Sequence, residues 1–238
     1  MRNDWIAKKS LLLRRPYRGF GKRLVDIGVS VIVLLVTAPL LLIIALAIKL
    51  DSPGPVLFRQ NRTGKDGVTF RICKFRSMGR NNNVYDASTA DQVTRVGAWL
   101  RRTSLDELPQ LLNVLRGEMS LIGPRPWIPD YHAVMNPNQR RRFEVRPGIT
   151  GLAQAQGRNA ISIFQKIEWD LRYVESVSLR TDLSIIVRTL RMIGDDSILD
   201  IGKEGINAEI HQLSKQNGIG SVPSFDDDMG ETNDLGAV

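Results

Sequence analysis

The sequence of 238 residues has little of what builds a disulfide framework or a zinc site. Its single cysteine, Cys73, excludes an internal disulfide bond. The two histidines, His132 and His211, lie far apart with no cysteine near either of them, so the sequence offers no zinc site. The chain is long enough for one substantial hydrophobic core, and we expect one main domain with appendages.

Acidic residues are also in the minority. The chain has 25 aspartates and glutamates against 33 lysines and arginines, and the run Asp226 to Asp228 makes the rest of the chain more basic than this total suggests. A partner of the protein is therefore expected to be anionic. Nucleic acid, acidic phospholipid and phosphorylated small molecules all meet this condition, so charge alone leaves three classes open.

Charged residues are absent from Ile27 to Ile48, an apolar run long enough to cross a bilayer as a helix. Basic residues flank both ends, so both ends have the same cytoplasmic preference, which a spanning helix should not show. Pro39 near the middle should kink the helix. We therefore predict a bent, re-entrant helix over residues 21–50, with Thr37 or the following domain satisfying the freed backbone groups. A single-pass anchor and a cleavable signal peptide are the alternatives.

Two strands are predicted after the apolar run, from Val56 to Arg59 and from Val68 to Phe75, joined through a turn over Gly64 to Gly67. In the second strand, period-two alternation places Lys74 on the same face as the apolar side chains. An inward-facing lysine needs an anionic partner, which a phosphate would supply. The alternative is that the strand ends or bulges before Lys74.

The C-terminal third contains one clear helix. From Thr181 to Ile193, apolar residues recur at helical spacing, with Arg188 and Arg191 on the other side. Two placements fit this amphipathic helix: the headgroup region of a membrane, or the surface of the domain core. The pattern weakens from Gly202 onward. The expected division is a basic N-terminal extension (1–20), the re-entrant helix (21–50), the main domain (51–201) and a C-terminal extension that is disordered at its end (202–238).

Two adjacent carboxylates, Asp106 and Glu107, follow a pair of arginines. Ser104 and Glu107 fit the S-x-x-E capping box of a helix start, in which case Asp106 would only complement the helix dipole. Pro109, early in the same helix, makes the local geometry less regular than an ideal cap. In the functional interpretation, neighbouring residues on a helix face different ways, so one carboxylate attacks a phosphorus atom while the other holds a hard cation.

Two proline-containing loops each present one arginine. Arg125 lies in the segment Gly123 to Pro126, and Arg146 begins the segment 146–151, whose glycines permit close backbone approach to a ligand. An arginine on a rigid loop suits a diphosphate, because its guanidinium binds phosphate oxygens bidentately and loses little entropy on binding. Taken singly, each loop is better explained as a structural turn.

Together, four blocks of this sequence resemble the bacterial sugar transferase family, the small monotopic phosphoglycosyl transferases. In chain order the blocks are KRLVDIGVSVIVLLVTAPLLLI, VLFRQNRTGKDGVTFRICKFRSM, LRRTSLDELPQLLNVLRGEMSLIGPRP and RRRFEVRPGITGLAQAQGRNAIS. Each block alone is a weak match, whereas four in the family's order and at compatible spacings are specific. One departure is Ala38, because some relatives carry serine before the helix-breaking proline.

The resemblance implies a helix-dominated α+β fold, with a re-entrant membrane helix hairpin bent at Pro39 and a cytoplasmic catalytic domain that carries a small β-hairpin and interfacial amphipathic helices. It also implies an enzyme that moves a sugar 1-phosphate from a UDP-sugar to polyprenyl phosphate and so starts glycan assembly. In this scheme Asp106 attacks the sugar-bearing phosphorus and UMP leaves. The lipid phosphate then attacks the aspartyl phosphosugar. Asp106 and Glu107 would hold Mg²⁺.

The resemblance also implies which residues contact the ligands. Those assigned to the nucleotide sugar are Lys74, Arg76, Arg125, Arg146, Gly148, Thr150, Gln154, Arg158 and Asn159. Arg101 and Arg102 are assigned to the lipid phosphate. The expected partners are the UDP-sugar, polyprenyl phosphate and membrane lipid, with no nucleic acid and with a homodimer left open. The expected location is the bacterial inner membrane, with the catalytic domain facing the cytoplasm.

Two rival hypotheses stay open. An ordinary glycosyltransferase would release UDP rather than UMP. A basic, membrane-anchored adaptor would bind anionic lipid or nucleic acid without turnover. The sequence does not identify the sugar, and similarity over residues 157–160 to relatives that use N-acetylated sugars is only a hint.

Overall fold

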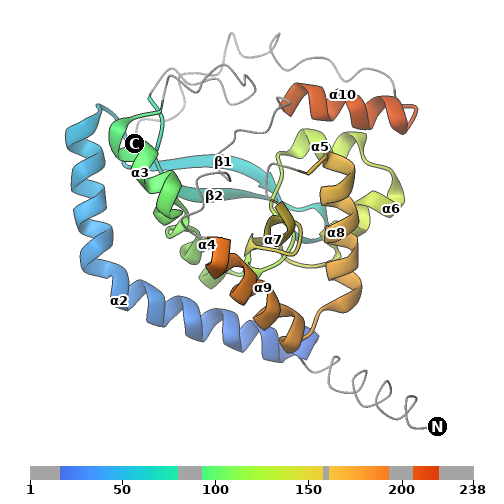
Figure 1. Cartoon of the computed structure of the whole chain (residues 1–238), viewed down its shortest axis with the longest axis horizontal. Helices are drawn as coiled ribbons and strands as arrows, with labels where there is room; N and C mark the ends of the chain where they lie inside the picture. The colour runs from blue at the N-terminus through green and yellow to red at the C-terminus, as the bar shows by residue number, and fades with distance from the viewer. Residues whose placement is uncertain (1–16, 80–92, 158–160, 193–205, 220–238) are drawn as a thin grey trace.

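A computed structural model of the protein describes residues 17–79, 93–157, 161–192 and 206–219. In these residues helices surround two small sheets, each of two strands (Figure 1). The helix-dominated α+β fold and the small β-hairpin are therefore confirmed. Arg158, Asn159 and Ile193 lie outside the described residues, as does the segment after residue 219, which was predicted to be disordered.

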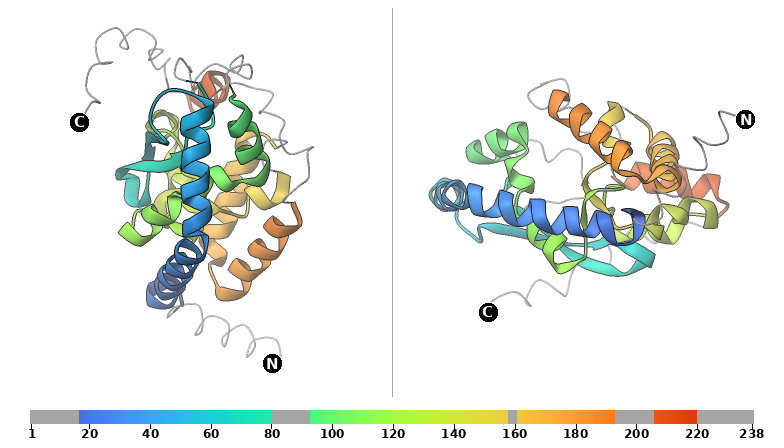
Figure 2. Two further views of the ribbon diagram at one scale, coloured as in Figure 1. Left: turned by 90° about the vertical axis from the view of Figure 1, so that its left-hand side faces the viewer. Right: turned by 90° about the horizontal axis from the view of Figure 1, so that it is seen from below.

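The longest helix, α2 (Lys22–Asp51), follows a π-helical turn, η1 (Tyr17–Gly21). In the described part of the chain, Tyr17–Asp51 is the one helical stretch long and apolar enough to cross a membrane. The helix bends sharply part-way along, so that its two arms run in different directions (Figures 1 and 2). Pro39 lies inside α2 and cannot donate the hydrogen bond of its turn, so we attribute the bend to it.

The hydroxyl of Thr37 donates to the carbonyl oxygen of Val33 at 2.7 Å. This bond lies one turn before the proline, and such back-bonding itself favours bending. The carbonyl that the proline leaves without its usual donor belongs to Leu35, four residues before Pro39. Thr37 therefore shapes the bend but does not satisfy the group that was expected to need it.

Buried polar contacts tie α2 to the rest of the protein. Asp26 accepts hydrogen bonds from the Ser120 hydroxyl and the Leu121 backbone N–H, each at 3.0 Å. Lys22 forms an ion pair with Asp182 at 2.6 Å. Beyond Pro39 the contact is apolar: Ile44 and Ile48 are buried against Phe75 and Leu100. The first arm is thus held mainly by polar contacts and the second arm by apolar packing.

The predicted hairpin is confirmed. Strand β1 (Leu57–Thr63) pairs with β2 (Thr69–Phe75) in an unbroken antiparallel register. The turn between them contains η2 (Lys65–Gly67), where Asp66 and Gly67 adopt positive φ angles of 55° and 80°. The first strand is longer than predicted. Because Lys74 still pairs in register with Phe58, the second strand neither ends nor bulges before it.

Helix α3 (Arg95–Thr103) is followed by the 3-10 turn η4 (Leu105–Glu107) and helix α4 (Gln110–Arg116). A buried amide attaches α4 to β2. The Asn113 side chain accepts from the backbone N–H of Cys73 at 3.0 Å and donates to the carbonyl of Arg71 at 2.8 Å. The turn before α4 is thereby held over the end of the hairpin.

Strand β3 (Ser120–Ile122) pairs in parallel with β4 (Gly148–Thr150). Two glycines lie where the backbones of the two strands come close. A Cβ atom on Gly148 would be 2.1 Å from the backbone nitrogen of Gly123. The glycine at position 148 thus permits close approach to another part of the backbone. The short elements around this sheet are α5 (Pro129–Val134), α6 (Pro137–Arg140), η5 (Arg141–Glu144) and α7 (Gln154–Gly157).

Helix α8 (Ile163–Ser176) begins with a capping box formed by Ser162 and Gln165. Helix α10 (Ile206–Gln216) packs against the same core, where Leu213 is fully buried. The folded part of the chain therefore extends beyond residue 201, into the region predicted as an extension. The cluster that α10 joins is built from Trp127, Ile128, Tyr131, Val134, Met135, Phe143, Ile163, Ile167 and Leu213.

The predicted amphipathic helix is α9 (Leu179–Met192). It packs on the domain through Asp182 and Ile185, which are buried. Its predicted apolar face is not the packed one, because Leu183 and Leu190 expose 53% and 63% of their surface. The alternative in which this apolar face packs on the surface of the domain core is therefore wrong.

Candidate active site

The two adjacent carboxylates lie in the turn between α3 and α4. The turn is made by Ser104, which ends α3 with a positive φ of 56°. Asp106 and Glu107 follow in η4, and Pro109 sits at the start of α4. The predicted capping box is wrong, because the Ser104 side chain makes no capping hydrogen bond at either of these helix starts. The Glu107 carboxylate is turned to other partners.

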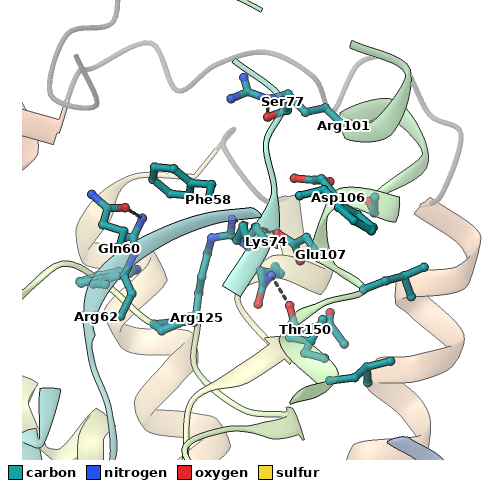
Figure 3. Close-up of a pocket in the computed structure, with 18 of the residues that line it drawn as sticks. Phe58, Gln60, Arg62, Lys74, Ser77, Arg101, Asp106, Glu107, Arg125 and Thr150 are labelled. Carbon is teal, nitrogen blue, oxygen red and sulfur yellow. Dashed lines mark hydrogen bonds and ion pairs between the residues drawn. The ribbon is translucent and has the colours of Figure 1, made fainter. Parts of the chain in front are cut away.

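Those partners are two cations from different elements. Lys74 on β2 lies 2.7 Å from Glu107 Oε1, and Arg125 lies 3.3 Å from the same oxygen. Lys74 therefore faces inward, as the strand alternation predicted, and it has an anionic partner within the protein. The arrangement joins three separate parts of the sequence at one carboxylate oxygen (Figure 3).

The two carboxyl groups have different electrostatic environments. Burial tends to raise the pKa of Glu107, but the charges of Lys74 and Arg125 outweigh it and lower this pKa from 4.5 to about 2. Burial raises the pKa of Asp106, although the charge of Lys74 acts against it. No hydrogen bond or ion pair joins the Asp106 carboxylate to another of the described residues. Glu107 is thus held as an ion-paired anion, while Asp106 is the more basic and less engaged group.

Both carboxylates open into a cavity of about 1440 Å³. Its walls come from the hairpin, from the loops around Arg125 and Thr150, and from α8, α9 and α10. Two valines of α2, Val29 and Val33, also line it, together with Ile186 and Leu190 of α9. The cavity therefore extends from a charged centre to an apolar side, which is formed by the long apolar helix α2 and by the exposed face of α9.

The sequence profile described as bacterial sugar transferase matches residues 17–195, which include every element of the charged centre. The chain belongs to the bacterial sugar transferase family.

Several relatives of this transferase have named activities. It is 46% identical over 181 residues to the UDP-glucose:undecaprenyl-phosphate glucose-1-phosphate transferase of Caulobacter vibrioides, covering 71% of this chain and 68% of that protein. It is 45% identical over 186 residues to the protein of the same name from Escherichia coli K12, covering 71% and 39%.

A third relative differs in its named sugar. The UDP-N-acetylgalactosamine-undecaprenyl-phosphate N-acetylgalactosaminephosphotransferase of Aeromonas hydrophila is 44% identical over 193 residues, covering 76% of this chain and 45% of that protein. The transferase described here thus spans less than half the length of the Escherichia coli and Aeromonas relatives.

The structure brings most of the predicted ligand-binding residues of the transferase to one cavity. Those that line it are Lys74, Arg76, Arg101, Asp106, Glu107, Arg125, Thr150 and Gln154. Arg101 donates to the Ser77 hydroxyl at 2.8 Å, and Figure 3 shows this pair above Asp106. Thr150 shares a hydrogen bond with Thr189 of α9 at 2.9 Å. Gln154 donates to the Ile149 carbonyl at 3.1 Å.

Two of the predicted arginines have structural contacts. Arg76 donates to the carbonyl oxygens of Pro53 and Ser52, each at 2.7 Å, and so ties β2 to the loop after α2. Arg146 donates to the carbonyl of Gly117 at 2.8 Å. Of the predicted ligand-binding residues that the structure describes, Arg102, Arg146 and Gly148 do not line the cavity.

Sequence reasoning missed another group of polar residues in the cavity. They are Gln60, Arg62, Tyr131, Lys166, Asp170 and Glu209. The strand alternation that placed Lys74 inward would also have placed Gln60 and Arg62 on that face, had the first strand been predicted at its full length. Lys166 and Asp170 are four residues apart on a helix, which is the usual spacing of a surface ion pair, and no sequence signal pointed to a cavity.

Proposed function

We propose that this chain transfers a sugar 1-phosphate from a UDP-sugar to polyprenyl phosphate and thereby starts the assembly of a glycan. The observation that carries the proposal is the single cavity that contains the Asp106 and Glu107 carboxylates, their cations and the apolar side chains of α2 and α9. A charged, water-borne donor and a lipid-borne phosphate acceptor both need access to one centre, and this cavity offers walls for each. The names of the relatives agree with this reaction.

Asp106 is the proposed nucleophile. Its carboxylate oxygen would attack the phosphorus that bears the sugar, forming an acyl phosphate while the bond to UMP breaks and UMP leaves with the electron pair. An oxygen of the polyprenyl phosphate would then attack the same phosphorus, and the Asp106 carboxylate would be released. Asp106 suits this role better than Glu107, because a raised pKa makes a carboxylate more nucleophilic and an ion-paired carboxylate is occupied.

The side chains fit a magnesium ion. In the described ranges, no three His, Cys, Asp or Glu side chains gather as a complete metal site. Mg²⁺ in phosphoryl transfer commonly takes one or two carboxylates and completes its coordination with phosphate oxygens and water. We propose that Asp106 and Glu107 hold it. When bound, it would neutralise negative charge on the diphosphate.

The surrounding cations would position the two phosphate-bearing ligands. Arg125 and Lys74 lie beside Glu107, where a diphosphate would meet their positive charge. Arg101 lies on the Ser77 side of the cavity and is proposed for the lipid phosphate. Thr150 and Gln154 remain candidates for the nucleotide sugar because they line the cavity. The contacts of Arg76 and Arg146 favour a supporting role, in which they hold the loops of the site in place.

We further propose that α2 enters the cytoplasmic leaflet and returns to the same side. The bend in α2 and the basic residues at both of its ends support this topology (Figure 1). The exposed apolar face of α9 and the half-exposed Trp99 of α3 would lie at the same membrane surface. The catalytic domain would then face the cytoplasm, where UDP-sugars are made.

The product of the reaction tests the proposal. Purified protein incubated with a UDP-sugar, Mg²⁺ and polyprenyl phosphate should release UMP, and removal of Mg²⁺ with a chelator should stop the release. Release of UDP would favour an ordinary glycosyltransferase instead. Salt-sensitive binding of anionic lipid or nucleic acid, without any nucleotide product, would favour the adaptor.

A further inference from the structure

The cavity has a second polar end, away from Asp106. Tyr131 of α5, Lys166 and Asp170 of α8, and Glu209 of α10 line it. These three helices lie at the end of the hairpin opposite to α3 (Figure 1). The hairpin connects the two ends. In Figure 3, Gln60 and Arg62 of β1 lie on the side of Arg125 opposite to Asp106.

Helix α10 holds its carboxylate in a fixed position at this end. Lys166 lies 2.8 Å from Glu209 Oε1, and the hydroxyl of Tyr131 donates to the other oxygen. Leu213, one turn further along α10, is fully buried and anchors the helix to the core. These contacts therefore fix the position of the Glu209 side chain, unlike that of a solvated surface residue.

Asp170 supplies an independent sign of a ligand. The side chain is buried, and its Oδ2 atom accepts from Arg142 Nη2 at 2.6 Å. Its Oδ1 atom is buried and has no hydrogen-bond partner in the part of the chain that the structure describes. An unsatisfied buried carboxylate oxygen costs free energy, which a hydrogen-bond donor from a ligand would recover once neighbouring side chains move to admit it.

The chemistry of this end suits a neutral group that is rich in hydroxyls. Each carboxylate at this end is paired with its own cation, Asp170 with Arg142 and Glu209 with Lys166. Lys74 and Arg125 share one carboxylate, so a phosphate is better placed beside them. Asp170 and Glu209 accept hydrogen bonds, while Lys166 donates them. Both a sugar ring and a uracil ring satisfy such a set, so side-chain chemistry alone does not choose between the two ends of a UDP-sugar.

The position of α10 in the sequence decides between them. Residues 206–216 follow the stretch that matches the family profile, which ends at residue 195. The names of the relatives share the UDP group and differ in the sugar, glucose in one and N-acetylgalactosamine in another. An element outside the shared stretch is expected to contact the part of the donor that varies.

We propose that α10 completes a subsite for the sugar ring, in which Glu209, Lys166 and Asp170 bind the sugar hydroxyls and set the sugar preference. This inference rests on the proposed function. It makes Glu209 a specificity residue of this chain and leaves the phosphoryl transfer to the centre around Asp106.

The test compares sugar preference between variants. The kcat/KM for UMP release is measured with UDP-glucose, UDP-galactose and their N-acetylated counterparts, for the wild type, Glu209→Gln and Lys166→Met. Glu168→Gln is the matched control, because Glu168 lies on α8 in an exposed ion pair with Arg172. The ratio between two sugars does not depend on the amount of folded enzyme, so partial unfolding of a variant does not obscure the result.

We expect Glu209→Gln and Lys166→Met to change the ratio between the preferred sugar and its epimer by about tenfold. Inhibition by UMP should stay within twofold of the wild type, and Glu168→Gln should leave both quantities unchanged. Unchanged sugar ratios in active variants would overturn the inference while leaving the proposed function standing. Weaker UMP inhibition, with all sugars affected alike, would assign this end to the uridine instead. A wild-type protein that releases no UMP from any donor would overturn both.

Discussion

At the scale of single residues, Asp106 and Glu107 show how two adjacent carboxylates acquire different tasks. Glu107 is held by Lys74 and Arg125, so its charge is compensated within the protein. Asp106 is free of such pairs among the described residues, and burial raises its pKa. A nucleophile needs a basic, unengaged oxygen, whereas a positioning carboxylate benefits from fixed partners.

Replacing Lys74 tests the value of the cation at this centre. Lys74→Met keeps most of the side-chain volume but removes one positive charge from Glu107 and from the proposed diphosphate position. We expect kcat for UMP release to fall by about 100-fold or more. Lys65→Met is the control, because Lys65 lies exposed in the hairpin turn. Activity within a factor of two of the wild type in Lys74→Met would show that this lysine has no part in transfer.

The lowered pKa of Glu107 predicts a pH-dependent contribution to stability. The pKa of this group is about 2 in the folded protein and 4.5 in the reference state, so its ion pairs stabilise the fold fully above about pH 4.5. The stabilisation is lost as the pH falls toward 2. The difference in free energy of unfolding between the wild type and Glu107→Gln, measured with denaturant in detergent micelles, should therefore be largest near neutral pH and shrink below 4.5. A difference that is constant over this range would refute the ion-paired state.

At the scale of elements, the pairing of β3 with β4 depends on a close contact between two glycines. The sequence predicts that the glycines after Arg146 permit close approach of the backbone to a ligand. The structure shows the Gly148 backbone against that of Gly123 instead. The glycine at position 148 thus serves a contact between two backbone segments, and a sequence does not show which surface comes close to a glycine.

Alanine substitution at Gly148 should therefore destabilise the protein. The added Cβ would lie 2.1 Å from the Gly123 nitrogen, which forces the two backbones apart. We expect a loss of about 1–3 kcal/mol in the free energy of unfolding. Gly28→Ala is the control, because nothing lies within 4 Å of a Cβ at that position in α2. Equal stabilities of the two variants, measured by denaturant unfolding, would contradict the close contact.

The bend in α2 makes a prediction about topology. Pro39→Ala restores the backbone donor of that turn and should straighten the helix. Single cysteines placed at Phe20 and Leu50, both exposed, report on the two ends when Cys73 is replaced by alanine. A membrane-impermeant maleimide should label both positions from the same side in the otherwise wild-type protein and from opposite sides in Pro39→Ala. Labelling from opposite sides without the Pro39 change would refute the re-entrant helix.

At the scale of the whole molecule, sequence patterns predicted local elements better than their assembly. Period-two alternation placed Lys74 inward, and helical spacing predicted α9. Neither pattern carries information about long-range partners. Only the folded chain shows that Lys74 pairs with Glu107 and that Leu183 and Leu190 point outward. Ser104 failed as a cap for a related reason: the motif fits a helix start, but its positive φ ends the preceding helix.

Much of the candidate site was predictable because its charged residues lie in the sequence blocks that resemble the family. Asp106, Glu107 and Arg125 come from one of the sequence blocks that resemble the family and Lys74 from another, and the fold joins them. The polar end near α10 was not predictable. Its residues come from helices whose sequence spacing is that of ordinary surface ion pairs, and Glu209 lies where the apolar pattern is weak.

The central claim is that Asp106 carries the sugar phosphate between donor and acceptor. The most direct measurement is the intact mass of the purified protein after incubation with UDP-sugar and Mg²⁺, without polyprenyl phosphate, followed by peptide mapping of any adduct. We predict that the protein gains the mass of one sugar phosphate on the peptide containing Asp106, that polyprenyl phosphate removes it, and that Asp106→Asn never acquires it. An adduct on another residue, or UMP release at full rate from Asp106→Asn, would contradict the account.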